Sequence, residues 1–135
     1  MTLECIFCKI IAGEIPTSKI YEDNDTIAFL DIQPSTAGHC LVIPKKHYEN
    51  IIDCDELTLR RVIGTVQKVA VKVKKELNAE GINIVQNNGK HAGQAVFHIH
   101  FHVIPRYIND DFKIHYPKIE VDDNYFAEMT ERLTL

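Results

Sequence analysis

Three histidines stand at alternate positions, His98, His100 and His102, within one apolar stretch of the chain. Side chains alternate between the two faces of a β-strand, so a strand here places the three imidazoles on one face, with neighbouring backbone positions roughly 6.6 Å apart. Imidazole can serve as a metal ligand, a nucleophile or a proton donor. Three of the seven histidines on one strand face therefore indicate a functional site.

Three interpretations of this strand compete on the residues alone. The first is a half-polar strand that faces water. The second is a catalytic zinc site built on a His-x-His pair and a third ligand. The third is nucleophilic catalysis by one imidazole, with the other histidines contacting phosphate and tuning protons. Spacing does not decide between the second and the third.

A second group of candidate ligands lies near the N-terminus, where Cys5 and Cys8 form a Cys-x-x-Cys pair. Such a pair serves as a redox couple, as two buried small side chains, or as half of a structural zinc site. The zinc interpretation requires two more nitrogen or sulfur ligands.

Composition limits the class of protein. The chain has 135 residues, of which 45% are hydrophobic and 25% charged, and its net charge is -4. These values are typical of one globular domain over 1–135 and argue against a general binder of duplex nucleic acid. The sequence has no apolar run of the ~20 residues that a membrane span needs, and no signal pattern, so we expect a cytoplasmic protein without a membrane partner.

Periodicity predicts the elements that position these residues. Apolar residues recur at spacings of three and four from Leu59 to Leu77, which predicts one long amphipathic helix. Asp53 and Glu56 resemble a helix start, and Asn78 a stop. The other expected elements are helices at 6–12 and 124–133 and strands at 19–22, 26–31, 39–43, 82–86 and 96–105. Hairpin-linked strands around one long helix predict an α+β fold with a five-stranded, largely antiparallel sheet.

The histidine strand resembles the signature of the histidine triad (HIT) family. Residues 98–104 fill every position of the pattern His-apolar-His-apolar-His-apolar-apolar. Four further blocks are similar to the bacterial zinc-containing branch of the family and to its purine nucleotide phosphoramidases; they lie at 5–16, 28–32, 38–47 and 93–97. The resemblance covers about 4–107 and leaves 108–135 as a C-terminal extension.

The resemblance implies a fold and a reaction. It implies a homodimer whose sheets are continuous, with the long helix from about Asp55 at the interface. It also implies that His100 attacks the α-phosphate of a purine nucleotide derivative, such as an adenosine phosphoramidate or a dinucleoside polyphosphate, to form a nucleotidyl-histidine that water then hydrolyses. His39, His98 and His102 are the other expected catalytic residues.

The same resemblance implies a nucleotide pocket around His100 and His102. Asp31 is expected to accept the ribose hydroxyls, and Asn87 to contact the ribose-phosphate region. Backbone N–H groups of a glycine loop are expected near phosphate. The loop residues are Gly93, Gln94 and Ala95. The candidates to enclose the base, for which plain core packing is the alternative, are Ile6, Phe7, Ile10, Phe29, Ile32 and Leu41.

Two further expectations follow. Ala95 stands where several phosphoramidate-cleaving members have a serine that protonates the leaving amine, which puts the preferred leaving group in question. The resemblance also implies one structural zinc ion per chain, held by Cys5, Cys8, His47 and His98.

Two rival functions remain, a regulatory or scaffold protein that binds nucleotide with incidental hydrolysis, and a catalytic zinc hydrolase.

Overall fold

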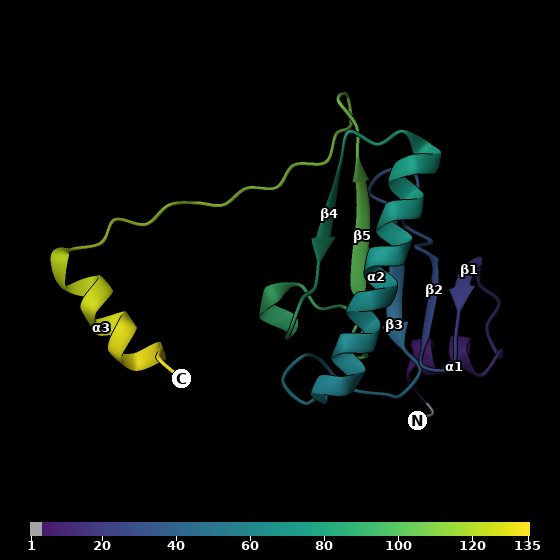
Figure 1. The fold of residues 1–135 in the computed structure, drawn as a ribbon, viewed down its shortest axis with the longest axis horizontal. Coiled ribbons are helices and arrows are strands. Elements are labelled where there is room, and N and C mark those ends of the chain that lie inside the picture. The colour runs from purple at the N-terminus through teal and green to yellow at the C-terminus, as the bar shows by residue number, and fades with distance from the viewer. Residues whose placement is uncertain (1–3) are drawn as a thin grey trace.

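Five strands form one antiparallel sheet in the order β1-β2-β3-β5-β4 (Figure 1). The structure is a computed structural model in which residues 4–135 are described. The strands are β1 Lys19–Glu22, β2 Thr26–Leu30, β3 Cys40–Pro44, β4 Gly81–Val85 and β5 Phe101–Arg106. The predicted α+β fold with a five-stranded antiparallel sheet is confirmed.

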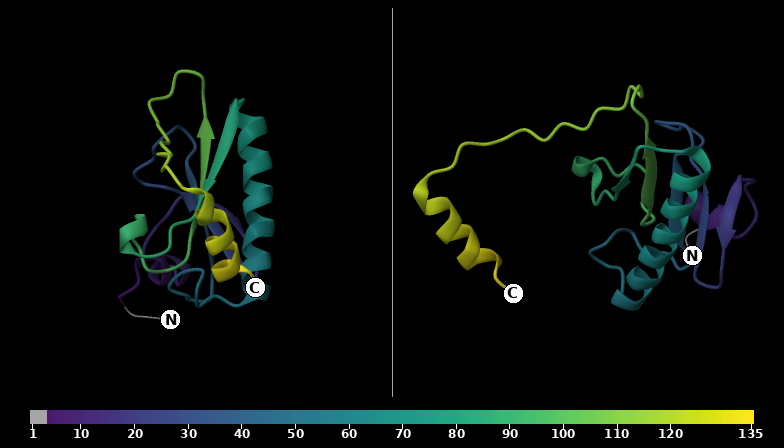
Figure 2. Two further views of the ribbon diagram at one scale, coloured as in Figure 1. Left: turned by 90° about the vertical axis from the view of Figure 1, so that its left-hand side faces the viewer. Right: turned by 45° about the horizontal axis from the view of Figure 1, so that its top comes forward.

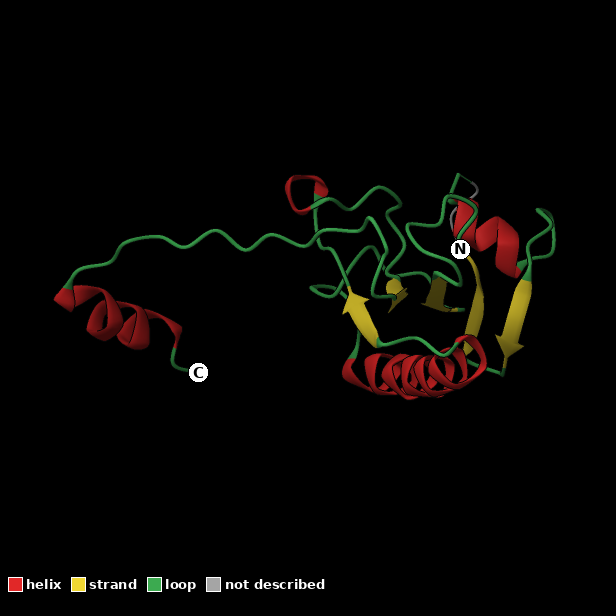
Figure 3. Ribbon diagram, turned by 90° about the horizontal axis from the view of Figure 1, so that it is seen from above, coloured by secondary structure: helices red, strands yellow, loops and turns green. Residues whose placement is uncertain are grey.

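Helix α2, Glu56–Leu77, crosses one face of the sheet (Figure 3). Its apolar stripe, which includes Val62, Val66 and Val69, packs on Val42 of β3 and Val103 of β5 to form the larger core cluster. The helix begins at Asp55, whose carboxylate accepts the Thr58 N–H, and ends at Asn78 in the left-handed conformation. The predicted start at Asp53 was wrong, because its carboxylate instead accepts backbone N–H groups of the preceding turn.

The opposite face of the sheet carries a second core beneath helix α1, Ile6–Ile11. Phe7 of α1 packs on Ile27, Phe29, Leu41 and Ile43. These strand residues alternate with those that face α2, as the pleat of a strand requires. Because both faces of β3 are covered, all five of its residues are buried.

The fifth strand begins later than predicted. Hydrogen-bonded pairing starts at Phe101, whereas the sequence predicted a strand from Val96. Before Phe101 the chain bends at residues 96–98 and lies against a loop, where Ile99 donates its N–H to the Tyr48 carbonyl at 2.8 Å. Alternation nevertheless holds, since Ile99 and Phe101 pack in the α2 core while the rings of His98 and His100 contact Phe7 on the α1 side.

The C-terminal extension leaves the body after β5. It runs without regular structure to helix α3, Asp123–Leu133, which lies apart from the sheet in Figure 1 and in the right-hand view of Figure 2. Helix α3 was predicted at 124–133. Within the described residues, no helix is long and apolar enough to cross a membrane.

Candidate active site

A cleft of about 310 Å³ opens on the α1 side of the sheet, next to the histidine strand. His100 and His102 line one wall, and Asp31 and Ala95 lie at its edges. The remaining wall is mostly apolar; its residues are Ile6, Phe7, Ile10, Ile15, Pro16, Thr17, Phe29, Leu30, Ile32, Gln33, Leu41 and Val96. A flat apolar ligand portion beside a phosphate group fits such a surface. A separate apolar groove between β1 and α2 contains no histidine.

His100 is held with one ring nitrogen free. Its Nδ1 lies 2.8 Å from the backbone carbonyl of His98, and a carbonyl can only accept a hydrogen bond. Nδ1 therefore carries the proton in the neutral ring, and Nε2 keeps its lone pair. Burial lowers the pKa of His100, although the hydrogen bond to His98 opposes this shift. The ring is thus a neutral imidazole with a nucleophilic nitrogen at the cleft.

A hydrogen-bonded histidine pair lies beside His100. The Ser35 N–H donates to Nδ1 of His39 at 3.0 Å, so the neutral His39 ring carries its proton on Nε2. That Nε2 lies 2.9 Å from Nδ1 of His102, which must then accept, and the His102 proton is left on Nε2. The Ser35 N–H therefore fixes the tautomer of His39, which in turn fixes the tautomer of His102. His102 is left with an Nε2–H that can donate a hydrogen bond.

Asp31 lies beside this pair. One carboxylate oxygen of Asp31 is 3.5 Å from Nε2 of His39, and the other accepts the Gln33 N–H at 2.9 Å. Asp31, His39 and His102 also form a group with metal-ligand spacing. Their hydrogen bonds argue against a metal there, because Nε2 of His39 holds a proton whenever Nδ1 accepts from Ser35.

The buried His102 ring makes stability depend on pH. Burial lowers the pKa of His102 to about 4, whereas a histidine in an unfolded chain titrates near pH 6.5. Between these values the unfolded state binds more protons, so the free energy of unfolding falls as the pH falls from about 6.5 to 4. In His102→Asn we expect the number of protons taken up on unfolding in this pH range to fall by about one, which makes the dependence of the free energy of unfolding on pH less steep. The measurement is urea unfolding at a series of pH values. Equal slopes in the two proteins would contradict the assignment.

Four ligand atoms converge where α1 meets the start of the histidine strand. Nδ1 of His98 lies 3.5 Å from Sγ of Cys5, 3.6 Å from Sγ of Cys8 and 3.1 Å from Nδ1 of His47. Sγ of Cys8 lies 3.4 Å from Nδ1 of His47. The sequence thus identified a set of residues that the fold brings together from three segments.

These separations are close to those around a tetrahedral zinc ion, with the two histidine nitrogens slightly nearer each other. Zn–S bonds of about 2.3 Å and Zn–N bonds of about 2.0 Å at tetrahedral angles separate neighbouring ligand atoms by roughly 3.3–3.8 Å. The tautomer of His98 also fits, because its Nε2 lies 2.8 Å from the Pro44 carbonyl, which leaves the Nδ1 lone pair directed at the cluster. Burial lowers the pKa of His98 to about 4, which keeps the ring neutral.

In the predicted glycine loop, two backbone N–H groups are already hydrogen-bonded within the loop. Gly93 donates its N–H to the Lys90 carbonyl and Gln94 to the Gly89 carbonyl, so both groups already have partners. The buried Gln94 side chain bonds to the backbone of the loop and of Glu49. The Asn87 side-chain nitrogen lies 3.8 Å from the position that a Cβ on Gly93 would take. Of the three loop residues predicted near phosphate, Ala95 lines the cleft, and direct contacts from Asn87, Gly93 and Gln94 stay predictions.

Several contributors were missed from the sequence. Ile15, Pro16 and Thr17 line the cleft after the turn that ends α1, and the Ser35 N–H and the Pro44 carbonyl set ring tautomers. In the sequence, the only signals for these contributions were the nearby prolines, which mark the ends of regular elements. Cys40 packs in the core, and burial raises the pKa of its thiol to about 11.

The fold and the site together define a histidine triad protein, with the middle imidazole free to react. Comparison with known sequences agrees, since the HIT domain family model matches residues 12–109. The chain belongs to the HIT domain family.

Its relatives span archaea, fungi and bacteria. A HIT-like protein of Methanocaldococcus jannaschii is 55% identical over 106 residues, covering 78% of this chain and 81% of that protein. Adenosine 5'-monophosphoramidase of Candida albicans is 44% identical over 106 residues, covering 76% and 70%.

Solved structures are also similar. A crystal structure from Streptococcus mutans superposes with a TM-score of 0.95 at 41% identity, covering 98% of this chain and 85% of that chain. A zinc-bound histidine triad family protein of Mycobacterium smegmatis superposes with a TM-score of 0.79 at 40% identity, covering 85% and 84%.

Proposed function

We propose that this protein is a nucleotide hydrolase or transferase that cleaves the α-phosphate bond of adenosine or related purine nucleotide derivatives. The observation that carries the proposal is the His100 ring, whose Nδ1–H is fixed on the His98 carbonyl at 2.8 Å while Nε2 lies at the cleft. The similarity to a fungal adenosine 5'-monophosphoramidase supports the substrate class.

In the first step, Nε2 of His100 attacks the α-phosphorus and the bond to the leaving group breaks. The lone pair of Nε2 forms the new P–N bond, and the leaving group departs with the electrons of the broken bond. The ring becomes a cation, and its Nδ1–H bond to the His98 carbonyl stabilises that charge. In the second step, water attacks the same phosphorus, the P–N bond breaks, and the nucleoside monophosphate is released.

His102 is the proposed donor to the phosphoryl group. Its Nε2–H is left free by the hydrogen bonds that run from Ser35 through His39, and the ring centroid lies 5.1 Å from that of His100. A donor held in place before the reaction costs no reorganisation as negative charge develops. Because Ala95 has no hydroxyl, the proton for a leaving amine must come from His102 or from water.

The apolar wall and Asp31 are proposed to bind the nucleoside. Phe7 and Phe29 are nearly buried and pack edge to face, so they form the floor, while Ile10 and the exposed Ile32 lie nearer the rim. Asp31 lies at the polar edge beside His39 and is proposed to accept the ribose hydroxyls. This arrangement would favour a ribonucleotide over a free phosphate ester.

Zinc is proposed as a structural cofactor, one ion per chain, at Cys5, Cys8, His47 and His98. When bound, it would link α1, the segment after β3 and the histidine strand. Four protein ligands complete a tetrahedron and leave no position for a reacting water, which argues against a catalytic zinc hydrolase.

A homodimer is proposed from two neighbouring surfaces. Among the residues that the structure describes, strand β4 pairs only with β5, so its outer edge has free backbone groups, and Ile84 on it is 43% exposed. Lys72 lies on the flank of α2 that faces β1. Ile63 is exposed on the opposite flank of the helix. An apolar helix flank beside an open strand edge suits a second copy that continues the sheet.

A turnover screen tests the proposed activity. The purified chain is incubated with an adenosine phosphoramidate, an aminoacyl-adenylate and a dinucleoside polyphosphate, and AMP release is followed. We expect multiple turnovers with at least one of the three. Tight AMP binding without turnover of any of them would favour the regulatory or scaffold function instead.

A further inference from the structure

One side chain is buried in the otherwise exposed middle of the loop between β2 and β3, defined here as residues 31–39. The residues at 32–35 and 37 are exposed, whereas Thr36 is 8% exposed. The Thr36 hydroxyl donates to the Pro105 carbonyl of β5 at 2.7 Å. Pairing of β5 with β3 ends at Val103, so this hydrogen bond ties the loop to β5 beyond the paired residues.

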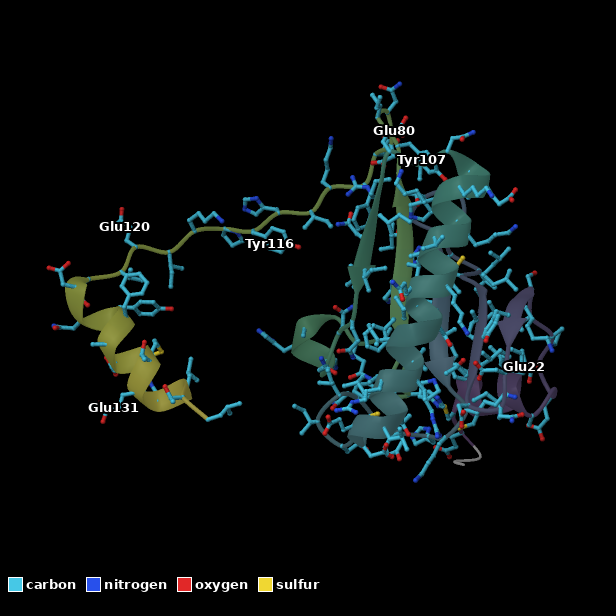
Figure 4. The ribbon with its side chains drawn as sticks, viewed as in Figure 1. Glu22, Glu80, Tyr107, Tyr116, Glu120 and Glu131 are labelled. Carbon is cyan, nitrogen blue, oxygen red and sulfur yellow. The ribbon has the colours of Figure 1, made fainter. Side chains whose placement is uncertain are left out.

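A second side chain fixes the same loop to the end of β5. The Tyr107 hydroxyl donates to the Ala37 carbonyl at 2.7 Å. Tyr107 follows β5 directly and lies at the end of the sheet where Glu80 follows α2 (Figure 4). Gly38 lies against the end of α2, because a Cβ at this position would overlap Cδ1 of Leu77. The loop is thus held between β5 and α2.

These contacts position the two backbone groups that hold His39. The Thr36 carbonyl accepts the His39 N–H at 3.2 Å, and the Ser35 N–H donates to Nδ1 of the His39 ring at 3.0 Å. The residue that bonds to β5 is therefore next to the amide that fixes the His39 tautomer. Because Pro105 and His102 both belong to β5, Thr36 sets the loop against the strand that carries the second ring.

Without the Ser35 N–H, the pair of rings has a second arrangement. In it His39 is protonated on Nδ1, the Nδ1–H of His102 donates to Nε2 of His39, and Nε2 of His102 keeps a lone pair. A lone pair repels the oxygens of a phosphoryl group, where the present arrangement offers a donor. The Asp31 carboxylate, 3.5 Å from Nε2 of His39, also favours the present arrangement, so loss of the Ser35 bond should give a mixture.

We propose that Thr36 is a positioning residue that keeps the proton of His102 on Nε2. It acts by holding the Ser35 N–H on Nδ1 of His39, and Tyr107 supports the same loop. The inference rests on the proposed function in so far as His102 donates to the phosphoryl group. The tautomer itself is a property of the protein without substrate.

Nitrogen NMR of the histidine-labelled protein without substrate tests the inference, because protonated and unprotonated ring nitrogens differ widely in chemical shift. The spectra are recorded above neutral pH, since burial lowers the pKa of both His39 and His102 and keeps the rings uncharged there. His102→Asn assigns the resonances. In Thr36→Val, which replaces the hydroxyl with a methyl group, we expect the Nε2 resonance of His102 to move toward the unprotonated value. Thr36→Ser, which restores the hydroxyl, should return it.

Turnover supplies a second measure. A donor fixed before the reaction acts mainly on the transition state, so kcat of Thr36→Val should fall about tenfold or more, with a smaller effect on KM. Thr36→Ser should regain most of this loss.

The matched control is Thr65→Val, the same substitution at another buried threonine. Thr65 is 2% exposed, and its hydroxyl oxygen lies 2.8 Å from that of Thr26, between α2 and β2. The variant loses a buried hydrogen bond away from the loop. It should lower the free energy of unfolding and leave the His102 tautomer and kcat unchanged.

Three results would overturn the inference. The first is an unchanged His102 tautomer in Thr36→Val, whatever happens to turnover. The second is the same change of tautomer in Thr65→Val, because any loss of packing would then suffice. The third is a changed tautomer with full kcat, which would show that the position of this proton does not matter to the reaction.

Two further arms keep the test decisive. If Thr36→Val does not fold, Tyr107→Phe removes the other hydrogen bond to the loop and must move the His102 resonance in the same direction; an unmoved resonance overturns the inference. If the unaltered protein turns over none of the substrates, the proposed function fails, whereas the tautomer measurement still decides whether Thr36 positions His102.

Discussion

Replacing His100 with asparagine should lower turnover by about a thousandfold or more while leaving AMP affinity near that of the unaltered protein. Asparagine retains an N–H donor for the His98 carbonyl, which Nδ1 of His100 contacts at 2.8 Å, but it has no nucleophilic nitrogen. The cleft walls stay in place, so binding survives. The measurement is steady-state release of AMP together with calorimetric binding of AMP.

The matched control is His91→Asn, the same substitution at an exposed histidine on the turn Lys90–Ala92. It should retain full activity. If His100→Asn turns over substrate at the original rate, nucleophilic catalysis by this imidazole is refuted. If it loses AMP binding as well, the ring acts in binding rather than in bond breaking.

Removal of zinc should lower the free energy of unfolding by about 4 kcal/mol, the stabilisation expected of a ligand present at a thousand times its dissociation constant. For a chain of 135 residues this corresponds to a drop in Tm of roughly 10–15 °C. The physical reason is that the ion would join Cys5 and Cys8 of the N-terminal segment to His47 and His98, in addition to the packing of that segment on the sheet. Thermal unfolding with and without a chelator, combined with elemental analysis, measures the effect.

Cys8→Ser should reproduce the chelator effect, because it removes a buried ligand at the centre of the cluster. Cys54→Ser is the matched control, since Cys54 lies outside the cluster and should leave Tm and zinc content unchanged. Metal-free protein with full thermal stability would refute a structural zinc ion at this site.

Local sequence patterns predicted the elements well where one periodicity dominated. The alternation of His98 to His102 predicted which side chains share a face, and it held even though strand pairing begins only at Phe101. The stop of α2 at Asn78 was also readable, because few residues adopt the left-handed conformation. The start of α2 at Asp55 was not readable, because Asp53 and Asp55 are equally suitable capping residues. In the structure the Asp53 carboxylate accepts the Glu49 N–H, and Asp55 accepts the Thr58 N–H at the start of the helix.

The metal ligands were predicted from the family resemblance, and the fold brings all four within reach of one ion. The network that sets the histidine tautomers was not predictable, since it depends on backbone groups. Any residue can supply the N–H that Ser35 donates to His39, or the carbonyl that His98 offers to His100. The contribution of residues 15–17 to the cleft likewise depends on how the chain turns after α1.

The most direct test of the account is to trap the covalent intermediate. The protein is mixed with substrate, quenched within one turnover without acid, digested and analysed by mass spectrometry. The account predicts one nucleoside monophosphate attached to the peptide that contains His100, located on that residue by fragmentation and absent from His100→Asn. An adduct on another residue, or turnover with no adduct in either protein, would contradict it.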